Sequence, residues 1–308
     1  MMPSAGASPA RIARRFLAAV LAPTLLMSLA GCSDAPGKGA DDGPVASPLF
    51  YEIASSDGTV EGWLLGTIHA LPAGTRWQTP AISDAIGDAD LLVVEVRLGD
   101  PAKHRTVIAD LATTPGLPPL PQRLPPDLRP QLAALAERGN MGGGDFTDQE
   151  TWVMAISLAG IDAPGDWANG VDRALIADFT GRPIRELEGL RGQLSIFDRL
   201  PEAAQRTMLA AVVQDSGDTQ RDPLRLQRAW LAGDAAAIEQ STREGFLVDP
   251  VLREALLVGR NRRWVSALAP LLSDAPRPLI AVGAAHLVGP DGLVVMLGAQ
   301  GYSVRPIP

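Results

Sequence analysis

The stretch Leu279-Ile280-Ala281-Val282-Gly283-Ala284-Ala285-His286 is an apolar run that stops at small residues followed by a histidine. Such a run is typical of a strand buried on both faces. Far upstream, Gly62-Trp63-Leu64-Leu65-Gly66-Thr67-Ile68-His69 follows the same plan. Two of the three histidines of the chain therefore share one Gly-x-x-His context at opposite ends of the domain. Chance and core packing explain this coincidence poorly, so we expect both strands to serve one site.

Two further apolar segments stop at carboxylates. Leu91-Leu92-Val93-Val94 ends on Glu95, and a short strand predicted over 182–188 ends on Glu188. An isolated buried charge is costly, so a carboxylate at such a place must lie at a strand end or have a partner. For Glu95, a surface glutamate at a strand terminus is an equally good interpretation of the pattern.

The remaining pattern predicts an α/β fold. Leu49–Ala54 and Val60–Thr67 flank Asp57-Gly58, a strong hairpin turn signal. Thr147 and Glu150 have the spacing of a capping box at the start of one helix. Helices are predicted over 80–86, 103–112, 126–138, 148–158, 170–179, 191–200, 201–214, 223–232, 235–245, 250–272 and 291–299, and a closing strand over 302–307. We therefore expect a mixed central sheet flanked by helices, with a large helical insertion between about residues 101 and 180.

The four polar strand ends predict a metal site. In open α/β sheets, ligands bind outside the carboxyl ends of the strands, so parallel neighbours would point these side chains into one crevice. His69, His286 and Glu95 would form the shell of a divalent transition metal, with Zn, Mn, Co and Fe preferred over Ca. Such a metal activates water and polarises a carbonyl, which leaves one carboxylate, Glu95 or Glu188, as general base. Gly66 and Gly283 would let the backbone turn sharply and approach the ligand closely.

Commoner hydrolase signatures are absent from the sequence. It holds no Gly-x-Ser-x-Gly elbow, no phosphate loop and no His-Glu-x-x-His helix. The other polar features have plain interpretations. His104 is expected to be a solvated helix residue, and a solvated helix face with a tryptophan anchor explains Gly259–Trp264 as well as a functional role does.

The first residues read as a targeting segment. Arg11, Arg14 and Arg15 precede an apolar run that ends at Leu29-Ala30-Gly31-Cys32, which resembles a bacterial lipobox. We expect residues 1–31 to be a lipoprotein signal peptide, Cys32 to be lipidated, and residues 32–48 to be a flexible tether. Loss of residues 1–31 would remove three arginines and no acids, changing the net charge from −8 to −11. Nucleic acid is therefore not an expected partner.

Several of these residues together resemble one family. They are Leu65-Gly66-Thr67-Ile68-His69, Val93-Val94-Glu95, Gly170-Val171-Asp172, Leu187-Glu188 with Gln193 and Phe197, Arg260-Asn261 with Trp264, and Gly283-Ala284-Ala285-His286-Leu287. The set is similar to the TraB/GumN family, which includes the Tiki proteases, and it spans residues 49–308. One departure is Gly-Ala-Ala-His, where many relatives have a second glycine.

The resemblance implies both a fold and an activity. The fold would be EreA/ChaN-like, related to the erythromycin esterases and the haem-binding ChaN proteins, and the activity would be metal-dependent peptide hydrolysis. Glu95, Glu188, Arg260 and Asn261 would be catalytic residues. Arg260 would bind a substrate carboxylate or an oxyanion, since a guanidinium is permanently charged and bidentate.

Three functions remain open from the sequence. The first is a lipid-anchored metallohydrolase of the bacterial cell envelope, on the outer membrane facing the periplasm, acting on a peptide or another small molecule. The second is a lipoprotein that binds haem, iron or a peptide without turnover. The third is a scaffold without a working site. The sequence does not indicate an oligomeric state.

Overall fold

The computed structural model describes residues 46–97, 101–142, 144–273 and 276–308. The predicted signal peptide at 1–31, the lipidation site Cys32 and most of the predicted tether lie outside these ranges. Within them, no helix combines the length and the apolar character needed to cross a membrane.

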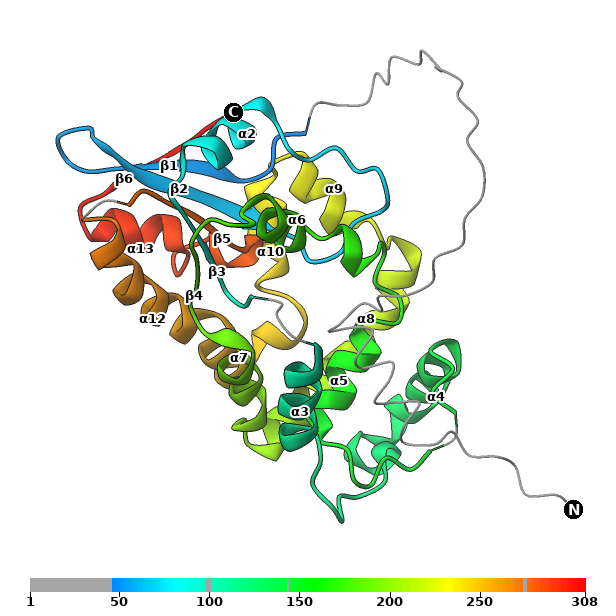
Figure 1. The fold of residues 1–308 in the computed structure, drawn as a ribbon. Coiled ribbons are helices and arrows are strands. Elements are labelled where there is room, and N and C mark those ends of the chain that lie inside the picture. Colours follow the sequence, from blue (N-terminus) through cyan, green and yellow to red (C-terminus); the bar gives the residue numbers. More distant parts are fainter. Residues whose placement is uncertain (1–45, 98–100, 143, 274–275) are drawn as a thin grey trace, which may run out of the picture.

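The described residues form a mixed six-stranded sheet with the strand order β4-β3-β5-β2-β1-β6 (Figure 1). The strands are β1 (Phe50–Ala54), β2 (Val60–Thr67), β3 (Leu91–Val94), β4 (Ile184–Glu186), β5 (Pro278–Gly283) and β6 (Ser303–Pro306). β4, β3, β5 and β2 run parallel, whereas β1 and β6 are antiparallel to their neighbours. The predicted α/β fold with a mixed sheet and a helical insertion is confirmed.

The first two strands form the predicted hairpin. Tyr51 pairs with Leu64 in an antiparallel register, and Gly58 in the turn has a φ of +88°. The carboxylate of Asp57 accepts hydrogen bonds from the Thr59 amide and the Ser55 hydroxyl. The Asp-Gly pair therefore closes the turn in the way its residue types predict.

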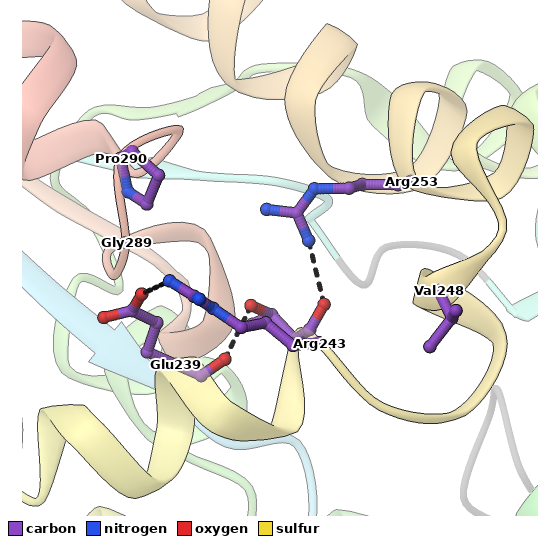
Figure 2. Close-up of a pocket in the computed structure, with 7 residues that line it drawn as sticks. Glu239, Arg243, Val248, Arg253, Gly289 and Pro290 are labelled. Atoms are coloured by element: carbon purple, nitrogen blue, oxygen red, sulfur yellow. Dashed lines mark hydrogen bonds and ion pairs between the residues drawn. The ribbon is translucent and has the colours of Figure 1, made fainter.

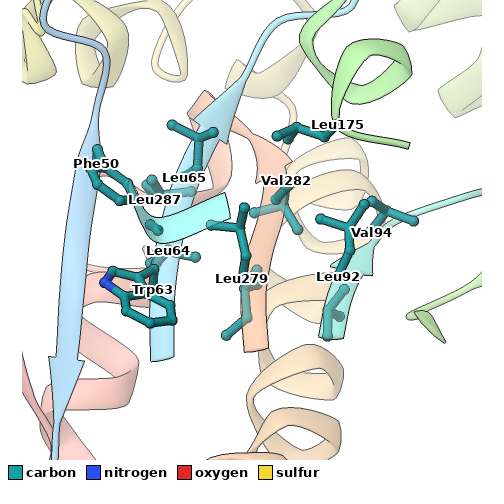
Figure 3. Packing of buried hydrophobic residues seen from close by; sticks show 14 of the residues in the cluster. Phe50, Trp63, Leu64, Leu65, Leu92, Val94, Leu175, Leu279, Val282 and Leu287 are labelled. Carbon is teal, nitrogen blue, oxygen red and sulfur yellow. The ribbon is translucent and has the colours of Figure 1, made fainter. Parts of the chain in front are cut away.

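The buried hydrophobic residues of the described chain form two cores. The first core holds the strands with residues of α2 (Pro80–Asp88), α6 (Val171–Asp178), α9 (Arg225–Leu231), α10 (Ala235–Ser241), α12 (Gly259–Leu268) and α13 (Leu293–Ala299). Figure 3 shows Val282 of β5 and Val94 of β3 beside Leu175 of α6 in this core. The continuous apolar strands are buried on both faces, as parallel strands usually are.

The second core is built from helices and the loops between them, without strand residues, and lies below the sheet in Figure 1. It holds residues of α3 (Pro101–Leu111), α4 (Arg129–Arg138), α5 (Thr151–Ala159), α7 (Gly189–Asp198), α8 (Glu202–Arg221) and α11 (Pro250–Arg253). α11 continues through a π-helical turn, η5 (Glu254–Val258), into α12. Because Leu256 belongs to the second core and Trp264 to the first, this one helix joins the two cores.

The π-turn depends on a glycine. The amide of Gly259 donates to the carbonyl of Glu254, five residues back. A Cβ atom at position 259 would lie 2.7 Å from that carbonyl oxygen, which no larger side chain tolerates. π-turns insert one extra residue into a helix and occur often at functional sites. Here the extra residue directly precedes Arg260 and Asn261.

Local predictions failed where pairing between segments overrides them. α5 begins at Thr151, and Glu150 at its N-cap makes no side-chain cap. The Thr147–Gln149 segment instead pairs with the chain near Thr113, where Leu117 donates to the Thr147 carbonyl, so it cannot start a helix. The predicted capping box is therefore wrong. His104 is also buried rather than solvated, with 6% of its surface exposed.

Candidate functional site

Four parallel strands end at one edge of the sheet, and the two predicted histidines and two predicted glutamates follow these strands, whereas Arg260 and Asn261 lie on α12. Glu95 directly follows β3, and His69 comes two residues after β2. His286 ends a short 3-10 turn after β5. β4 stops at Glu186, so Glu188 is not at a strand end as predicted but at the N-cap of α7. Because the strands are parallel neighbours, all four residues lie at the carboxyl edge where α/β sheets bind ligands.

The guanidinium of Arg260 connects three of these four side chains. Its Nε and Nη2 donate to the two carboxylate oxygens of Glu188 over 3.0 and 2.8 Å. Nη2 also donates to Glu95 over 2.6 Å, and Nη1 donates to His286 Nε2 over 3.1 Å and to the Leu256 carbonyl over 3.3 Å. A guanidinium has five N–H donors, and all five have acceptors here. Arg260 is therefore saturated and presents no donor to a substrate in this arrangement.

Glu95 is a buried acid that accepts three hydrogen bonds. It is 6% exposed, and its Oε1 accepts from the Gly283 amide while its Oε2 accepts from Gln193 and Arg260. Burial alone would raise the pKa of Glu95, but Arg260 above all, followed by the two histidines and the Gly283 amide, lowers it to about 2. Glu95 is thus a fixed anion at neutral pH and a weak base. The surface interpretation of Glu95 is wrong.

The tautomer of His286 follows from its neighbours. Its Nε2 accepts from Arg260, so its proton lies on Nδ1 and is donated to Asn261 Oδ1 over 2.6 Å. Asn261 Nδ2 in turn donates to the carbonyls of His286 and Asp291 over 3.2 and 2.7 Å. Burial, with the charge of Arg260, lowers the pKa of His286 to about 3. This histidine is a neutral, fully bonded part of the scaffold.

His69 lies in a different environment. Its side chain is 50% exposed, and its Nδ1 is 2.8 Å from Asp172 Oδ2. The other oxygen of Asp172 accepts from the Thr67 hydroxyl over 2.8 Å. The His69 ring stacks on Trp167, with ring centres 5.8 Å apart and planes within 10°. Asp172 therefore orients the ring through Nδ1, and Nε2 is directed away from this carboxylate.

The charge of His69 follows from nearby carboxylates. The surrounding protein atoms act to lower the pKa of His69, but Asp172 and, more weakly, Glu95 raise it to about 9. The contribution of Glu95 shows that the His69 ring lies within electrostatic range of the Arg260 network. Because the ring is half exposed, solvent screens these interactions and moderates their effect on stability.

The two Gly-x-x-His motifs contact each other. A Cβ atom on Gly66 would lie 3.1 Å from Ala284 and 3.2 Å from Leu287. Gly170 approaches the first motif from the other side, since its Cβ would lie 2.2 Å from the His69 carbonyl oxygen. Neither Gly66 nor Gly283 has a positive φ. Their backbones therefore make no left-handed turn. Gly66 permits close packing of the two motifs, whereas the predicted close approach to a ligand stays a prediction.

The donor set meets only part of what a metal ion needs. Both histidines have Nδ1 bonded to an orienting acceptor, which is the usual second shell of a metal-binding imidazole. However, the guanidinium of Arg260 occupies the free lone pair of His286 Nε2 and places a positive charge directly against Glu95 and Glu188, which opposes a metal ion at the same place. Among the described residues, no group of three or more His, Cys, Asp or Glu side chains is arranged around a possible ion. In this arrangement the residues do not fit the predicted metal.

Sequence reasoning missed the role of some site residues. From the sequence, Asp172 is noted within Gly170-Val171-Asp172 but is given no function. A carboxylate in the first turn of a helix beside a strand that leads to a histidine could have indicated a partner for that histidine. Gln193 on Glu95 and Trp264, which donates to Glu188 over 3.1 Å, likewise stand out in the sequence only as family positions. The stacking of Trp167 on His69 leaves no pattern in the sequence.

The fold and the site together define a class of α/β protein. In it, two Gly-x-x-His motifs pack together at the carboxyl edge of parallel strands, and an arginine joins the second histidine to two buried acids. A family model described as the TraB/PrgY/gumN family matches residues 49–306, and the chain belongs to this family. No curated protein and no solved structure matches the chain.

Proposed function

We propose that the protein is a hydrolase, acting on peptide bonds, in which His69 transfers the protons. The observation that carries this proposal is the His69–Asp172 pair: a half-exposed imidazole, oriented through Nδ1, beside a buried network of fixed charges. An oriented imidazole with a carboxylate partner is the commonest general acid and base in enzymes.

In the proposed reaction, His69 first accepts a proton and then donates it. With a pKa of about 9, His69 is neutral in roughly one molecule in a hundred at pH 7. In that form Nε2 accepts a proton from a water molecule as it attacks the substrate carbonyl. The resulting imidazolium, stabilised by Asp172, returns the proton to the leaving amine. The rate should therefore rise about tenfold per pH unit from pH 7 and level off near pH 9.

The buried network has a supporting role in this scheme. Arg260 neutralises Glu95 and Glu188, and Glu95 accepts from the Gly283 amide of the second motif. These bonds fix the backbone of the second motif against Gly66, one residue before the end of β2. Pre-arranged charges of this kind need no rearrangement during the reaction.

The divalent metal predicted from the sequence remains a proposal. Its support is the Nδ1 bonding of both histidines, and its obstacle is Arg260, which would have to release His286 and Glu95. A metal would supply an activated water and polarise the substrate carbonyl. We route no step through it.

A peptide digest separates these possibilities. The wild-type protein and His69→Ala are incubated with a peptide library, without addition, with EDTA, and with Mn, Co, Zn or Fe added back. We expect the variant to lose about 10³-fold in rate, since general acid-base groups contribute about 10² to 10⁴. EDTA-resistant cleavage supports the proton relay, and cleavage that returns only with a metal supports the metal. Equal rates for both proteins would refute the proposed role of His69.

Anchoring in the cell envelope is a separate proposal. It rests on the lipobox-like Leu29-Ala30-Gly31-Cys32. Cells expressing the full chain and Cys32→Ser are labelled with an alkyne analogue of palmitate and then fractionated. We expect label and membrane association in the wild type alone. Label on both proteins, or on neither, would contradict lipidation at this cysteine.

A half-exposed histidine beside Trp167 also suits a binding protein without turnover. If the protein binds haem, which the second interpretation of the sequence includes, His69 Nε2 would be the atom that holds the iron. Adding haemin to the purified protein tests this. A shifted Soret band that is lost in His69→Ala, together with no peptide cleavage, would replace the hydrolase proposal.

A further inference from the structure

A groove of about 890 Å³ lies between α7 and the helix that runs through α11 and η5. Gly192, Ser195, Ile196 and Arg199 form one wall, and Val251 and Ala255 belong to the other. The four α7 positions have i, i+3, i+4 and i+7 spacing, so they share one helix face. Glu188 also lines the groove, which therefore reaches the Arg260 network. We refer to this hollow as the α7 groove.

The size of the α7 groove suits a short extended chain. Glu188 lies at the N-cap of α7 and Arg199 at its C-cap. Eleven helical steps of 1.5 Å separate them, or about 16 Å. An extended peptide advances about 3.3 Å per residue, so about five residues span this length. Gly192 has no side chain and Ser195 has a small one, so a peptide backbone can approach α7 at these positions.

The two acids that line the α7 groove, Glu188 and Glu254, pair with Arg260 and Arg262, whereas the two arginines of its lining are less well paired. Arg199 is exposed, and its guanidinium has no ion pair or hydrogen bond among the described residues. Arg263 is 59% exposed and its closest acid is Glu188 at 4.0 Å, an acid that Arg260 already pairs. Two such arginines in a chain with a net charge of −8 favour a ligand that carries a carboxylate.

A second hollow, of about 370 Å³, gives the contrast (Figure 2). Its two arginines are both satisfied within the protein. Arg243 pairs with Glu239, and Arg253 donates to the Thr242 carbonyl over 2.8 Å and to Asp291 over 3.0 Å. This hollow has no unpaired arginine, whereas in the α7 groove the Arg199 guanidinium has no partner among the described residues and Arg263 has only its 4.0 Å contact with Glu188.

We propose that the α7 groove binds the substrate as an extended peptide of about five residues. Apolar side chains of the peptide pack against Ile196, Val251 and Ala255. A carboxylate of the peptide, either its C-terminus or an acidic side chain, pairs with Arg199, and the other end reaches the crevice at Glu188. This inference rests on the proposed peptidase function. It assigns the substrate specificity of that function to residues of α7.

Direct binding tests the groove without relying on cleavage. The His69→Ala protein is titrated, by fluorescence anisotropy, into three fluorescein-labelled pentapeptides of alternating leucine and alanine. One has a free carboxyl end, one is amidated, and one is amidated with glutamate as its last residue. We expect the free acid or the glutamate peptide to bind at least tenfold more tightly than the neutral peptide, as a charge-assisted hydrogen bond allows. The tighter of the two identifies the source of the carboxylate.

Two pairs of variants locate the binding. Gly192→Leu fills the groove, and its Cβ meets nothing closer than 3.7 Å, so α7 is not strained. Gly217→Leu on α8 is the matched control, with a nearest atom at 3.9 Å outside the groove. Arg199→Gln removes the charge, and Arg221→Gln, 77% exposed on α8, is its control. We expect Gly192→Leu to weaken binding of every peptide more than tenfold, and Arg199→Gln to affect only the peptides with a carboxylate.

The outcomes separate this inference from the proposed function. Equal affinity of Gly192→Leu and Gly217→Leu, or equal affinity for neutral and charged peptides, would overturn the groove even if the wild type cleaves peptides. If peptides bind in the α7 groove but the wild type does not cleave them, only the proposed hydrolase function is contradicted. Displacement of the peptides by dodecanoate at lower concentration than by unlabelled peptide would assign the groove to an acyl chain and refute the proposal.

Discussion

The two Gly-x-x-His motifs share a spacing and a place at strand ends, but they put their histidines in opposite states. His69 is half exposed and paired with Asp172, with a pKa raised to about 9. His286 is buried and bonded to Arg260 and Asn261, with a pKa lowered to about 3. The difference arises from the helix behind each motif, since α6 supplies an acid and α12 supplies a cation and an amide. Groups whose surroundings separate their pKa values in this way usually have different roles.

The largest effect is expected for Arg260→Met, because this substitution removes the cation that distinguishes the surroundings of His286 from those of His69. Glu95 and Glu188 would be left buried without a counter-ion, so we expect a loss of about 3–5 kcal/mol in the free energy of unfolding by urea. The pKa of His286 should rise, since two unpaired anions then face it. The freed acceptors should also take up Zn or Mn, which elemental analysis measures.

The neighbouring Arg262→Met provides the control for this prediction. Arg262 pairs with Glu254 at the surface, with 57% of its side chain exposed, and should cost less than about 1 kcal/mol. Equal effects of the two substitutions would show that the Arg260 network contributes nothing special.

Truncating each histidine to alanine compares the motifs directly. His286→Ala leaves an Arg260 donor and the Asn261 oxygen unpaired in the interior, so we expect a loss of roughly 2–4 kcal/mol. His69→Ala should cost under about 1 kcal/mol, because its ring is half in water. Urea unfolding of both variants gives the answer. A more destabilising His69→Ala would reverse our assignment of chemistry to one motif and scaffolding to the other.

Asp172→Asn should bring the titration of His69 closer to that of an ordinary histidine. Without the carboxylate, the pKa of His69 should fall from about 9 toward its usual 6.5. NMR titration of the His69 ring protons measures this shift. The rate profile should level off at a correspondingly lower pH. Asp178→Asn, on the exposed face of the same helix, should change neither, and an unshifted His69 in Asp172→Asn would show that other charges hold its proton.

The pH dependence of stability is the smallest expected effect, and the two histidines contribute with opposite signs. The folded state holds the His69 proton more tightly, so this contribution is complete below pH 6.5 and is lost as the pH rises through 9. His286 resists protonation when folded, so stability is lost as the pH falls from 6.5 toward 3. Glu95 adds a loss as the pH falls from 4.5 toward 2.

Urea unfolding between pH 4.5 and 9.5 checks both slopes. His69→Ala should flatten the curve above pH 6.5, and His286→Ala should flatten it below. If either variant flattens the wrong limb, the protonation states assigned to the two histidines are incorrect.

Much of the fold could be predicted because its signals are local. The runs before His69, Glu95 and His286 mark buried strands, and their common edge follows from parallel pairing. The Thr147 cap failed because segments far apart in the chain pair there, and Glu188 was misplaced because β4 is only three residues long. No local pattern could have shown that Arg260 uses all five donors, since its acceptors come from four separate parts of the chain.

The π-turn before Arg260 gives the site a dependence on backbone register. One residue of an α-helix corresponds to a rotation of about 100°. If the extra residue of the π-turn moved past position 260, the guanidinium would rotate out of the space between Glu95 and Glu188 without any bond in the sheet being broken. Gly259 fixes the extra residue in place. The ion pairs of Glu95 and Glu188 thus depend on the winding of one helix.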